Sequence, residues 1–179
     1  MEDLGAKARA WITSDAETTR KIESAYYCET RDVFQARLDR MAIVFDRDYL
    51  ITAIAGEIGN NSFDHNVGNW PDMPGVFFAY DEEIVVLADR GQGVFATLKK
   101  VKPELLNDTE ALKTAFTERL SGRFPERRGN GLKFVRESVS KQHLRLSFFS
   151  GTAQAELNEK IEIHQSDKAL RGCLAILKI

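Results

Sequence analysis

The feature that most constrains the fold is a pair of short apolar runs, GVFFAY at residues 75–80 and IVVLA at residues 84–88. Both runs are rich in β-branched or aromatic residues, and only three polar residues separate them. This composition and spacing predict a β-hairpin. The second predicted strand continues directly into DRGQG, residues 89–93, whose glycines are typical of a loop at the end of a strand.

The segments on either side of the hairpin predict both helices and strands. A long helix is predicted from Asp48 to His65, with a buried side formed by Tyr49, Leu50, Ala53, Ile54, Ile58 and Phe63. One or two helices are predicted in residues 1–40, another near 108–120, and a glycine-started helix in residues 129–141. Three more strands are predicted at residues 144–151, 152–158 and 173–179, with turns near Gly151 and in residues 164–172.

Length and composition indicate an ordinary globular chain. The 179 residues suffice for one domain with a core, and we expect a helical extension at 1–45 followed by a main domain at 46–179. The net charge of −2 gives no support for an electrostatic grip on nucleic acid. We expect no membrane span and no secretory signal, and we expect Cys28 and Cys173 to be reduced thiols of a cytoplasmic protein.

Three polar side chains recur at four-residue intervals along the predicted long helix. These are Glu57, Asn61 and His65, and residues four apart lie on one helix face. An acid, an amide and an imidazole are therefore stacked in a row. Taken alone, the row either faces solvent or lines a site.

Two glycine motifs follow the helix. The first is DRGQG at residues 89–93, and the second is RGNGL at residues 128–132, where a helix is predicted to start. Glycines allow close approach of the backbone, and free N–H groups at a helix start attract anions. The alternatives are a plain turn and a flexible helix start. The chain has no P-loop, and Phe134 stands where a dinucleotide fingerprint needs a third small residue.

The order of these motifs carries more information than any one of them. A helical E-x-x-x-N-x-x-x-H precedes a strand that ends in D-x-G-x-G, and a long polar segment then leads to G-x-G-L at a helix start. Over residues 46–179 the chain resembles the GHKL superfamily of ATP-binding domains. That superfamily includes sensor histidine kinases, the gyrase B subunit, the MutL mismatch repair protein and the anti-sigma-factor serine kinases.

The resemblance implies an α/β (α+β) two-layer sandwich of the Bergerat type. We therefore expect a mixed, mostly antiparallel sheet with helices on one face, which leaves the other face for the N-terminal helices. It also implies that ATP and Mg²⁺ bind between the helices and the sheet.

The resemblance assigns roles to individual residues. Glu57 would activate the attacking group, Asn61 would bind Mg²⁺, and Asp89 would accept a hydrogen bond from the adenine amino group. The remaining residues would contact the nucleotide, the glycines through the backbone and His65 from the helix: His65, Gly91, Gly93, Arg128, Gly129, Asn130, Gly131 and Leu132. Residues 94–128 would be the ATP lid, and Arg123, Arg127 and Arg128 are its candidates for a phosphate clamp.

The chain departs from the superfamily pattern at two places. Asp64 stands where many histidine kinases have a basic residue. Gly172-Cys173 begins the last predicted strand, where Gly-Thr is frequent, so a cysteine would have to replace the threonine's contact with the adenine-binding aspartate.

The same resemblance narrows the function. Residues 1–45 contain no histidine, and we expect no transducer domain after the ATP-binding region, so the anti-sigma type fits better than a histidine kinase or a gyrase. We expect a Mg-ATP-binding regulatory serine/threonine protein kinase or ATPase that acts on a partner protein. The alternatives are a nucleotide-gated protein-binding switch without significant catalysis and a scaffold that has lost ATP binding. The N-terminal helices would contact a partner, pack on the chain's own sheet or form a homodimer.

Overall fold

The computed structural model describes residues 3–21, 25–45, 48–118 and 131–179. Its helices are α1 (Leu4–Thr13), α2 (Ala16–Lys21), α3 (Arg31–Val44), α4 (Tyr49–Asn66), α5 (Gly93–Leu98), α6 (Asp108–Thr117) and α7 (Gly131–Lys141). Its strands are β1 (Tyr27–Cys28), β2 (Val76–Tyr80), β3 (Ile84–Asp89), β4 (Arg145–Leu157) and β5 (Ile161–Lys178).

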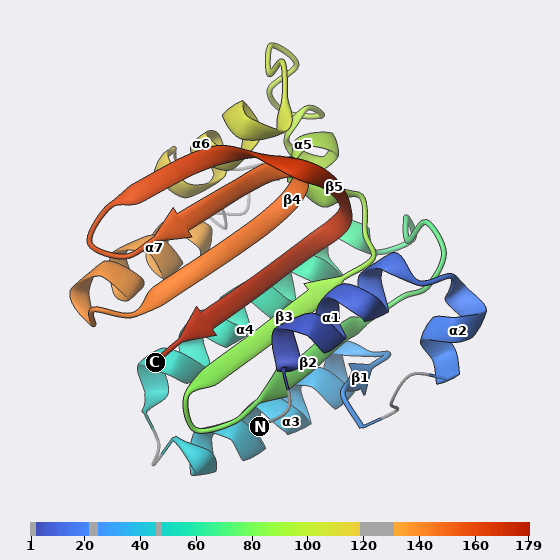
Figure 1. The fold of residues 1–179 in the computed structure, drawn as a ribbon, viewed down its shortest axis with the longest axis vertical. Coiled ribbons are helices and arrows are strands. Elements are labelled where there is room, and N and C mark those ends of the chain that lie inside the picture. Colours follow the sequence, from blue (N-terminus) through green and yellow to red (C-terminus); the bar gives the residue numbers. More distant parts are fainter. Residues whose placement is uncertain (1–2, 22–24, 46–47, 119–130) are drawn as a thin grey trace.

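The strands form one five-stranded sheet in the order β1-β2-β3-β5-β4. Every pairing among these strands is antiparallel, from Tyr27 opposite Phe77 at one edge to Arg145 opposite Lys178 at the other. Figure 1 shows α1 on one face of the sheet and α3 and α4 on the other. The predicted α+β architecture of a sheet layered with helices is confirmed.

The side chains of the sheet divide between two cores because successive strand residues point to opposite faces. On β3, Val85 and Leu87 belong to the core shared with α3, α4, α6 and α7, whereas Val86 and Ala88 belong to the core beneath α1. The predicted hairpin is present, since β2 and β3 pair from Val76–Asp89 to Tyr80–Val85. The same alternation places the side chains of the next two residues, Asp89 and Arg90, on opposite faces of the sheet.

The predicted long helix is present as α4. Asp48 caps it, because its carboxylate accepts hydrogen bonds from the N–H groups of Leu50 (3.0 Å) and Ile51 (3.3 Å). The prediction that Tyr49 is buried is wrong: it is 71% exposed at the first turn of the helix. Farther along, α4 lies so close to α3 that a Cβ at Gly59 would be 2.2 Å from Cζ of Phe34. Glycine at position 59 therefore makes the tight contact between these helices possible.

The N-terminal segment does not form a single appendage. Helix α1 packs across the sheet through Leu4, Ala8, Trp11 and Ile12, against a surface that includes Phe77. Residues 28–44 pack with the main core instead: β1 extends the sheet, with Cys28 in the main core and Tyr27 against the core beneath α1, and Phe34, Leu38 and Met41 of α3 pack beside α4. Of the three expectations for the N-terminal helices, packing of α1 on the chain's own sheet describes the fold.

The C-terminal hairpin differs from the prediction. The two strands predicted around Gly151 are one strand, β4, whose register with β5 shifts between Ser150 and Ala153. The polar stretch predicted as a turn, residues 164–172, lies within β5. Gly151 (φ 59°) and Gly172 (φ 65°) both have left-handed backbone angles at this shift, where the two strands bend together (Figure 1).

Candidate functional site

A cavity lies between α4 and the sheet, beneath α5 and beside α7. The space within it that the centre of a water-sized sphere can occupy is about 80 Å³. Five of the sequence-predicted site residues line it: Asn61, His65, Asp89, Gly93 and Leu132. Its other lining residues are Ile58, Ser62, Asn66, Val94, Thr97, Leu98, Ala115, Phe148 and Cys173. Most of the wall is apolar, and the polar groups are concentrated around Asp89.

Asp89 is the buried acid of this cavity. It is the last residue of β3, and its side chain is on the α4 face of the sheet, where the residue is only 2% exposed. Its carboxylate accepts hydrogen bonds from Ser62 Oγ (2.8 Å) and from the N–H of Gly91 (2.8 Å). Burial raises the pKa of the Asp89 carboxyl above its ordinary value, and the hydrogen bonds from Ser62, Gly91 and Cys173 oppose that shift.

Cys173 occupies the neighbouring position on β5, directly opposite Asp89 in the sheet. Its thiol donates to Oγ of Ser150 (3.6 Å), and it also lies beside the Asp89 carboxylate, whose pKa it lowers. Burial, and then the negative charge of Asp89, raise the pKa of the Cys173 thiol well above its ordinary value. The cysteine at this position therefore remains a neutral thiol beside the buried carboxylate, with its one hydrogen donated to Ser150.

Glu57 and Asn61 meet the start of α7. A Cβ added at Gly131 would lie 2.5 Å from Oε2 of Glu57 and 3.4 Å from Nδ2 of Asn61. The absence of a side chain at position 131 thus lets the Glu57 carboxylate approach the backbone at the first residue of the helix. Of the polar row predicted on α4, Asn61 and His65 line the cavity, whereas Glu57 lies beside α7 and, like the predicted residues Gly91 and Gly131, does not line it.

A second row of polar residues lies one position farther along α4. Ser62 donates to Asp89, and Asn66 is buried with its Oδ1 accepting from the N–H of Gln92 (2.9 Å) and its Nδ2 donating to the carbonyl of Ser62 (2.8 Å). A Cβ at Gly91 would lie 2.2–2.4 Å from the Asn66 amide atoms. The first glycine motif is thereby held against α4 through its backbone.

The turn into α5 uses the second glycine of that motif. Gly93 has φ 79°, a conformation that favours glycine. The N–H of the next residue, Val94, donates to Oγ of Ser150 (2.9 Å), and that hydroxyl donates to the carbonyl of Gly172 (3.1 Å). Ser150 therefore joins α5, β4 and β5 at the edge of the cavity.

Part of the predicted lid belongs to the folded core. Leu112 and Phe116 of α6 are buried in the main cluster, and Phe116 packs edge-on against Phe148 of β4. Three lysines of this region have partners outside the cavity: Lys99 with the Leu105 carbonyl, Lys100 with Gln92 and Lys102 with Glu118. The predicted phosphate-binding residues Arg123, Arg127, Arg128, Gly129 and Asn130 lie outside the described residues.

Asp64, the first departure from the superfamily pattern, has a structural contact in place of a contact with phosphate. Its carboxylate pairs with Arg31 at the start of α3. The ion pair joins α3 to α4 on the outside of the helix layer, so residue 64 is a structural contact in this chain.

The oxygen donors beside α7 suit a hard cation better than a soft one. The Glu57 carboxylate and the Asn61 amide are the kinds of ligand that Mg²⁺ accepts, and Mg²⁺ usually keeps several waters and substrate phosphates in its shell. Within residues 3–21, 25–45, 48–118 and 131–179, no group of three or more His, Cys, Asp or Glu side chains is arranged to hold a metal. A divalent cation here would need oxygen ligands from a bound anion.

Sequence reasoning missed three residues of the site. Ser62, Asn66 and Ser150 all have buried hydrogen bonds to backbone or to Asp89. Ser62 and Asn66 had a signal, because they repeat at four-residue spacing beside the row of Glu57, Asn61 and His65. Ser150 had none, since its partners Val94 and Gly172 are distant in the sequence.

The chain stands apart in the comparisons with known proteins. No protein-family model matches it, and the search of curated proteins found no match. No helix in the described part of the chain combines the length and the apolar character that a membrane crossing requires.

Proposed function

We propose that the cavity binds Mg-ATP and that the chain is a regulatory kinase or ATPase acting on a partner protein. One observation carries the proposal: Asp89, a buried carboxylate, lines an apolar cavity together with Asn61, and Asn61 and Glu57 both lie beside the start of α7. A flat aromatic base fits an apolar wall, and a buried acid specifies an amino group at its edge.

Each end of the cavity suits a different part of the nucleotide. Asp89 would accept a hydrogen bond from the exocyclic amino group of adenine, beside the donors Ser62 and Cys173 that hold it. Helix α7 begins at Gly131, and the backbone N–H groups of the first turn of a helix, which have no partner within the helix, favour phosphate oxygens. A bound Mg²⁺ would offset the phosphate charge, and Asn61 would supply it with an oxygen ligand.

Glu57 is the candidate general base. Its carboxylate is exposed, so a water or a partner's hydroxyl can reach it, and it lies beside Gly131 at the start of α7. A carboxylate within hydrogen-bond reach of the attacking oxygen can orient that oxygen and accept its proton. Phosphoryl transfer needs mainly such positioning together with charge neutralisation.

Calorimetric titration with Mg-ATP tests the binding half of the proposal. Asp89→Asn should weaken binding about tenfold or more, because a hydrogen bond to a buried charged group contributes roughly 1.5–3 kcal/mol. Asp167→Asn is the matched control, since Asp167 is an exposed carboxylate on β5 that does not line the cavity. Absence of ATP binding to the folded wild-type protein would overturn the proposal.

Phosphate release or labelling of a partner tests the catalytic half. Glu57→Gln should reduce turnover at least a hundredfold, within the range of general base catalysis, and leave the Kd for ATP within about threefold. Glu137→Gln controls for the loss of an exposed helical carboxylate. Tight binding without any product in the wild type would favour the nucleotide-gated switch.

One observation favours that second candidate. The residue after Asp89, Arg90, is fully buried and holds the last turn of α1 on the opposite face of the sheet. A switch needs such a connection between its ligand and a surface that a partner can sense, whereas an ATPase does not.

A further inference from the structure

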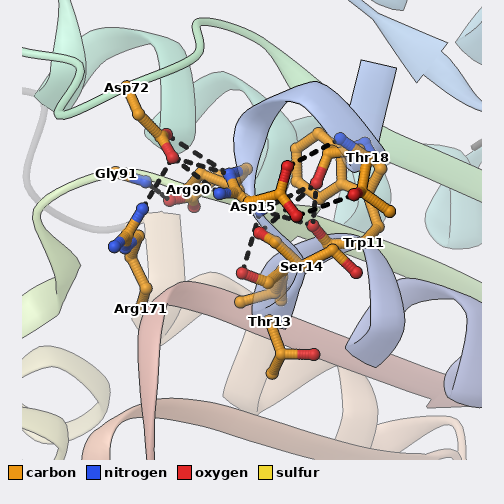
Figure 2. Close-up of polar contacts among 12 residues, drawn as sticks. Trp11, Thr13, Ser14, Asp15, Thr18, Asp72, Arg90, Gly91 and Arg171 are labelled. Carbon is orange, nitrogen blue, oxygen red and sulfur yellow. Dashed lines mark hydrogen bonds and ion pairs between the residues drawn. The ribbon is translucent and has the colours of Figure 1, made fainter. Parts of the chain in front are cut away.

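Arg90 joins the N-terminal segment to the strand that ends in Asp89. Its side chain is 1% exposed, which is rare for arginine, and its guanidinium lies over the Trp11 ring, 5.9 Å from the ring centroid, in addition to its polar contacts. Its Nη1 donates to the carbonyls of Trp11 (2.6 Å) and Ile12 (3.0 Å) and to Oγ1 of Thr19 (3.1 Å). Figure 2 shows the guanidinium between Trp11 on one side and Asp72 on the other.

The carbonyls that Arg90 binds are those that a helix leaves unpaired. The last four C=O groups of an α-helix have no partner within the helix, and α1 ends at Thr13. The last turn of α1 has no basic residue of its own. Arg90 therefore caps α1 from another element, and its positive charge faces the negative end of the helix dipole.

The other half of the guanidinium is held by the main domain. Nε and Nη2 of Arg90 donate to the Asp72 carboxylate, the shortest distance being 2.6 Å, and Arg171 of β5 contacts the same carboxylate at 2.6 Å. The charged partner of Arg90 thus stays with the sheet, whereas the N-terminal arm, residues 3–19, offers it only neutral acceptors. The arm can leave without separating the Arg90–Asp72 ion pair.

The docked arm also carries a cost. Trp11 Nε1 is the one buried side-chain polar atom, among the residues that the structure describes, that has no hydrogen-bond partner. When the arm is released, this N–H group can donate to water. When the arm is docked, the group is buried without an acceptor, and the lost hydrogen bond to water opposes docking. Apolar contacts and the hydrogen bonds from Arg90 stabilise the docked arm and offset the lost hydrogen bond of Trp11.

Arg90 directly follows Asp89, which lines the cavity, so no other residue separates the two. Asp89 Oδ1 accepts from the N–H of Gly91 (2.8 Å), so Arg90 is the central residue of a tight turn whose two ends meet on the cavity side. The next N–H, of Gln92, is held by Asn66 of α4 (2.9 Å). A displacement of Arg90 must rotate this turn and move Asp89 relative to Ser62.

We propose that Arg90 is a positioning residue that couples docking of the N-terminal arm to the shape of the Asp89 cavity. Occupation of the cavity fixes the Asp89–Gly91 turn and strengthens docking of the arm, and release of the arm loosens the turn and weakens ligand binding. The two effects are equal in free energy by linkage. The inference rests on the proposed function for the identity of the ligand, Mg-ATP, but the coupling itself can be measured without it.

The test changes the arm and measures the cavity. Thr19→Val removes one acceptor of Arg90 together with the bond that the same hydroxyl donates to the Trp11 carbonyl (3.2 Å), so the result is interpreted together with that of Arg90→Lys, which keeps the Thr19 hydroxyl. Thr13→Val makes the same chemical change at an exposed site on the arm. Hydrogen exchange of the ligand-free proteins is followed at the backbone amides of residues 11–14 and 91–94. Thr19→Val should speed exchange at both places about fivefold relative to Thr13→Val, and weaken Mg-ATP binding by a similar factor.

A second pair of variants tests the arginine itself. Arg90→Lys keeps the charge but cannot bridge Asp72 and the helix carbonyls at once, whereas Arg171→Gln removes a charge from the same carboxylate without touching the arm. Arg90→Lys should speed exchange at both segments, and Arg171→Gln should not. In the wild type, saturating Mg-ATP should slow exchange at residues 11–14, and Thr19→Val should reduce that protection.

Two results would overturn the coupling. In one, Thr19→Val and Arg90→Lys leave exchange at residues 11–14 unchanged, so that Arg90 does not hold the arm. In the other, they loosen the arm while residues 91–94 exchange as in Thr13→Val. Failure of the wild type to bind Mg-ATP is a separate outcome, because it refutes the proposed function while the ligand-free exchange still decides the coupling.

Discussion

Asp89 and Arg90 are adjacent in the chain, and their side chains lie on opposite faces of the same sheet. The carboxylate of Asp89 lines the cavity and accepts from Ser62 of α4, whereas the guanidinium of Arg90 binds the end of α1. The alternation of side chains along β3 continues for one residue past its last residue, Asp89, and produces this arrangement. A short peptide segment thus connects two surfaces that the sheet otherwise separates.

Asp89→Asn should not destabilise the ligand-free protein at neutral pH. Because burial raises the pKa of Asp89 in the folded state, ionisation of this group opposes folding above that pKa, and the opposition fades as the pH falls toward 3.8. An amide removes the charge, and its oxygen can still accept from Gly91. Thermal unfolding should give an unchanged or higher Tm and a flatter dependence on pH. A clearly lower Tm would mean that the hydrogen bonds outweigh the cost of burial.

Cys173→Ala should make ligand binding more sensitive to acid. The thiol beside Asp89 lowers the pKa of that carboxyl, so its loss raises the pKa further and protonates the carboxylate at a higher pH. We expect Mg-ATP affinity about fivefold below the wild type near pH 5.5, the size of one modest hydrogen bond, and a smaller difference at pH 8. Cys173→Ser keeps a hydrogen-bond donor, so its pH profile should follow that of the wild type. Titration of ATP itself affects all three proteins equally and does not change the comparison. Identical pH profiles for the alanine variant and the wild type would contradict the role of the thiol.

Asp72→Asn should loosen the N-terminal arm at neutral pH but not in strong acid. The hydrogen bond from Arg90 lowers the pKa of Asp72, so its stabilising effect is complete above the ordinary value of 3.8 and is lost as the pH falls through the lower, folded-state pKa. Urea unfolding at pH 7 should show a loss of about 1–3 kcal/mol. The gap between variant and wild type should close well below pH 3.8. A gap that is constant with pH would show that the charge of Asp72 is unimportant.

Gly91→Ala should displace Asn66 and destabilise the protein by about 2–4 kcal/mol. The new Cβ would lie 2.2–2.4 Å from the amide, and moving that amide breaks its bonds to Gln92 and Ser62. The double variant with Asn66→Ala has room for the methyl group, so the two losses should be less than additive in a double-mutant cycle. Full additivity in urea unfolding would place the cost of the alanine elsewhere.

The elements with regular patterns were predictable from the sequence, and the exceptions have physical reasons. The hairpin of β2 and β3 and the helices α4, α6 and α7 follow from apolar periodicity and capping or turn residues. Strand β1 has only two residues, too few for any period to show. The stretch 164–171 is rich in polar residues because one strand neighbour and much solvent surround it, so it was mistaken for a turn.

The site was predictable to the extent that its residues lie on one element. The row of Glu57, Asn61 and His65 can be seen in a helix period, and the glycine motifs in their spacing. The contacts that complete the site join distant segments: Ser62 and Asp89 are 27 positions apart, and Arg90 and Trp11 are 79. Pattern within one element carries no information about such pairs. For the same reason the sequence did not indicate why position 90 is an arginine.

The close approach of Gly59 to Phe34 has a consequence for how this chain can diverge. A side chain at position 59 would occupy the space of the aromatic ring, because even a Cβ would lie 2.2 Å from it. Descendants of this sequence can therefore exchange volume between the two positions but cannot increase both. In an alignment of homologues, large residues at position 34 should accompany glycine at position 59, and alanine or serine at 59 should accompany a smaller residue at 34. The spacing between the two helices would then be inherited as a property of the pair.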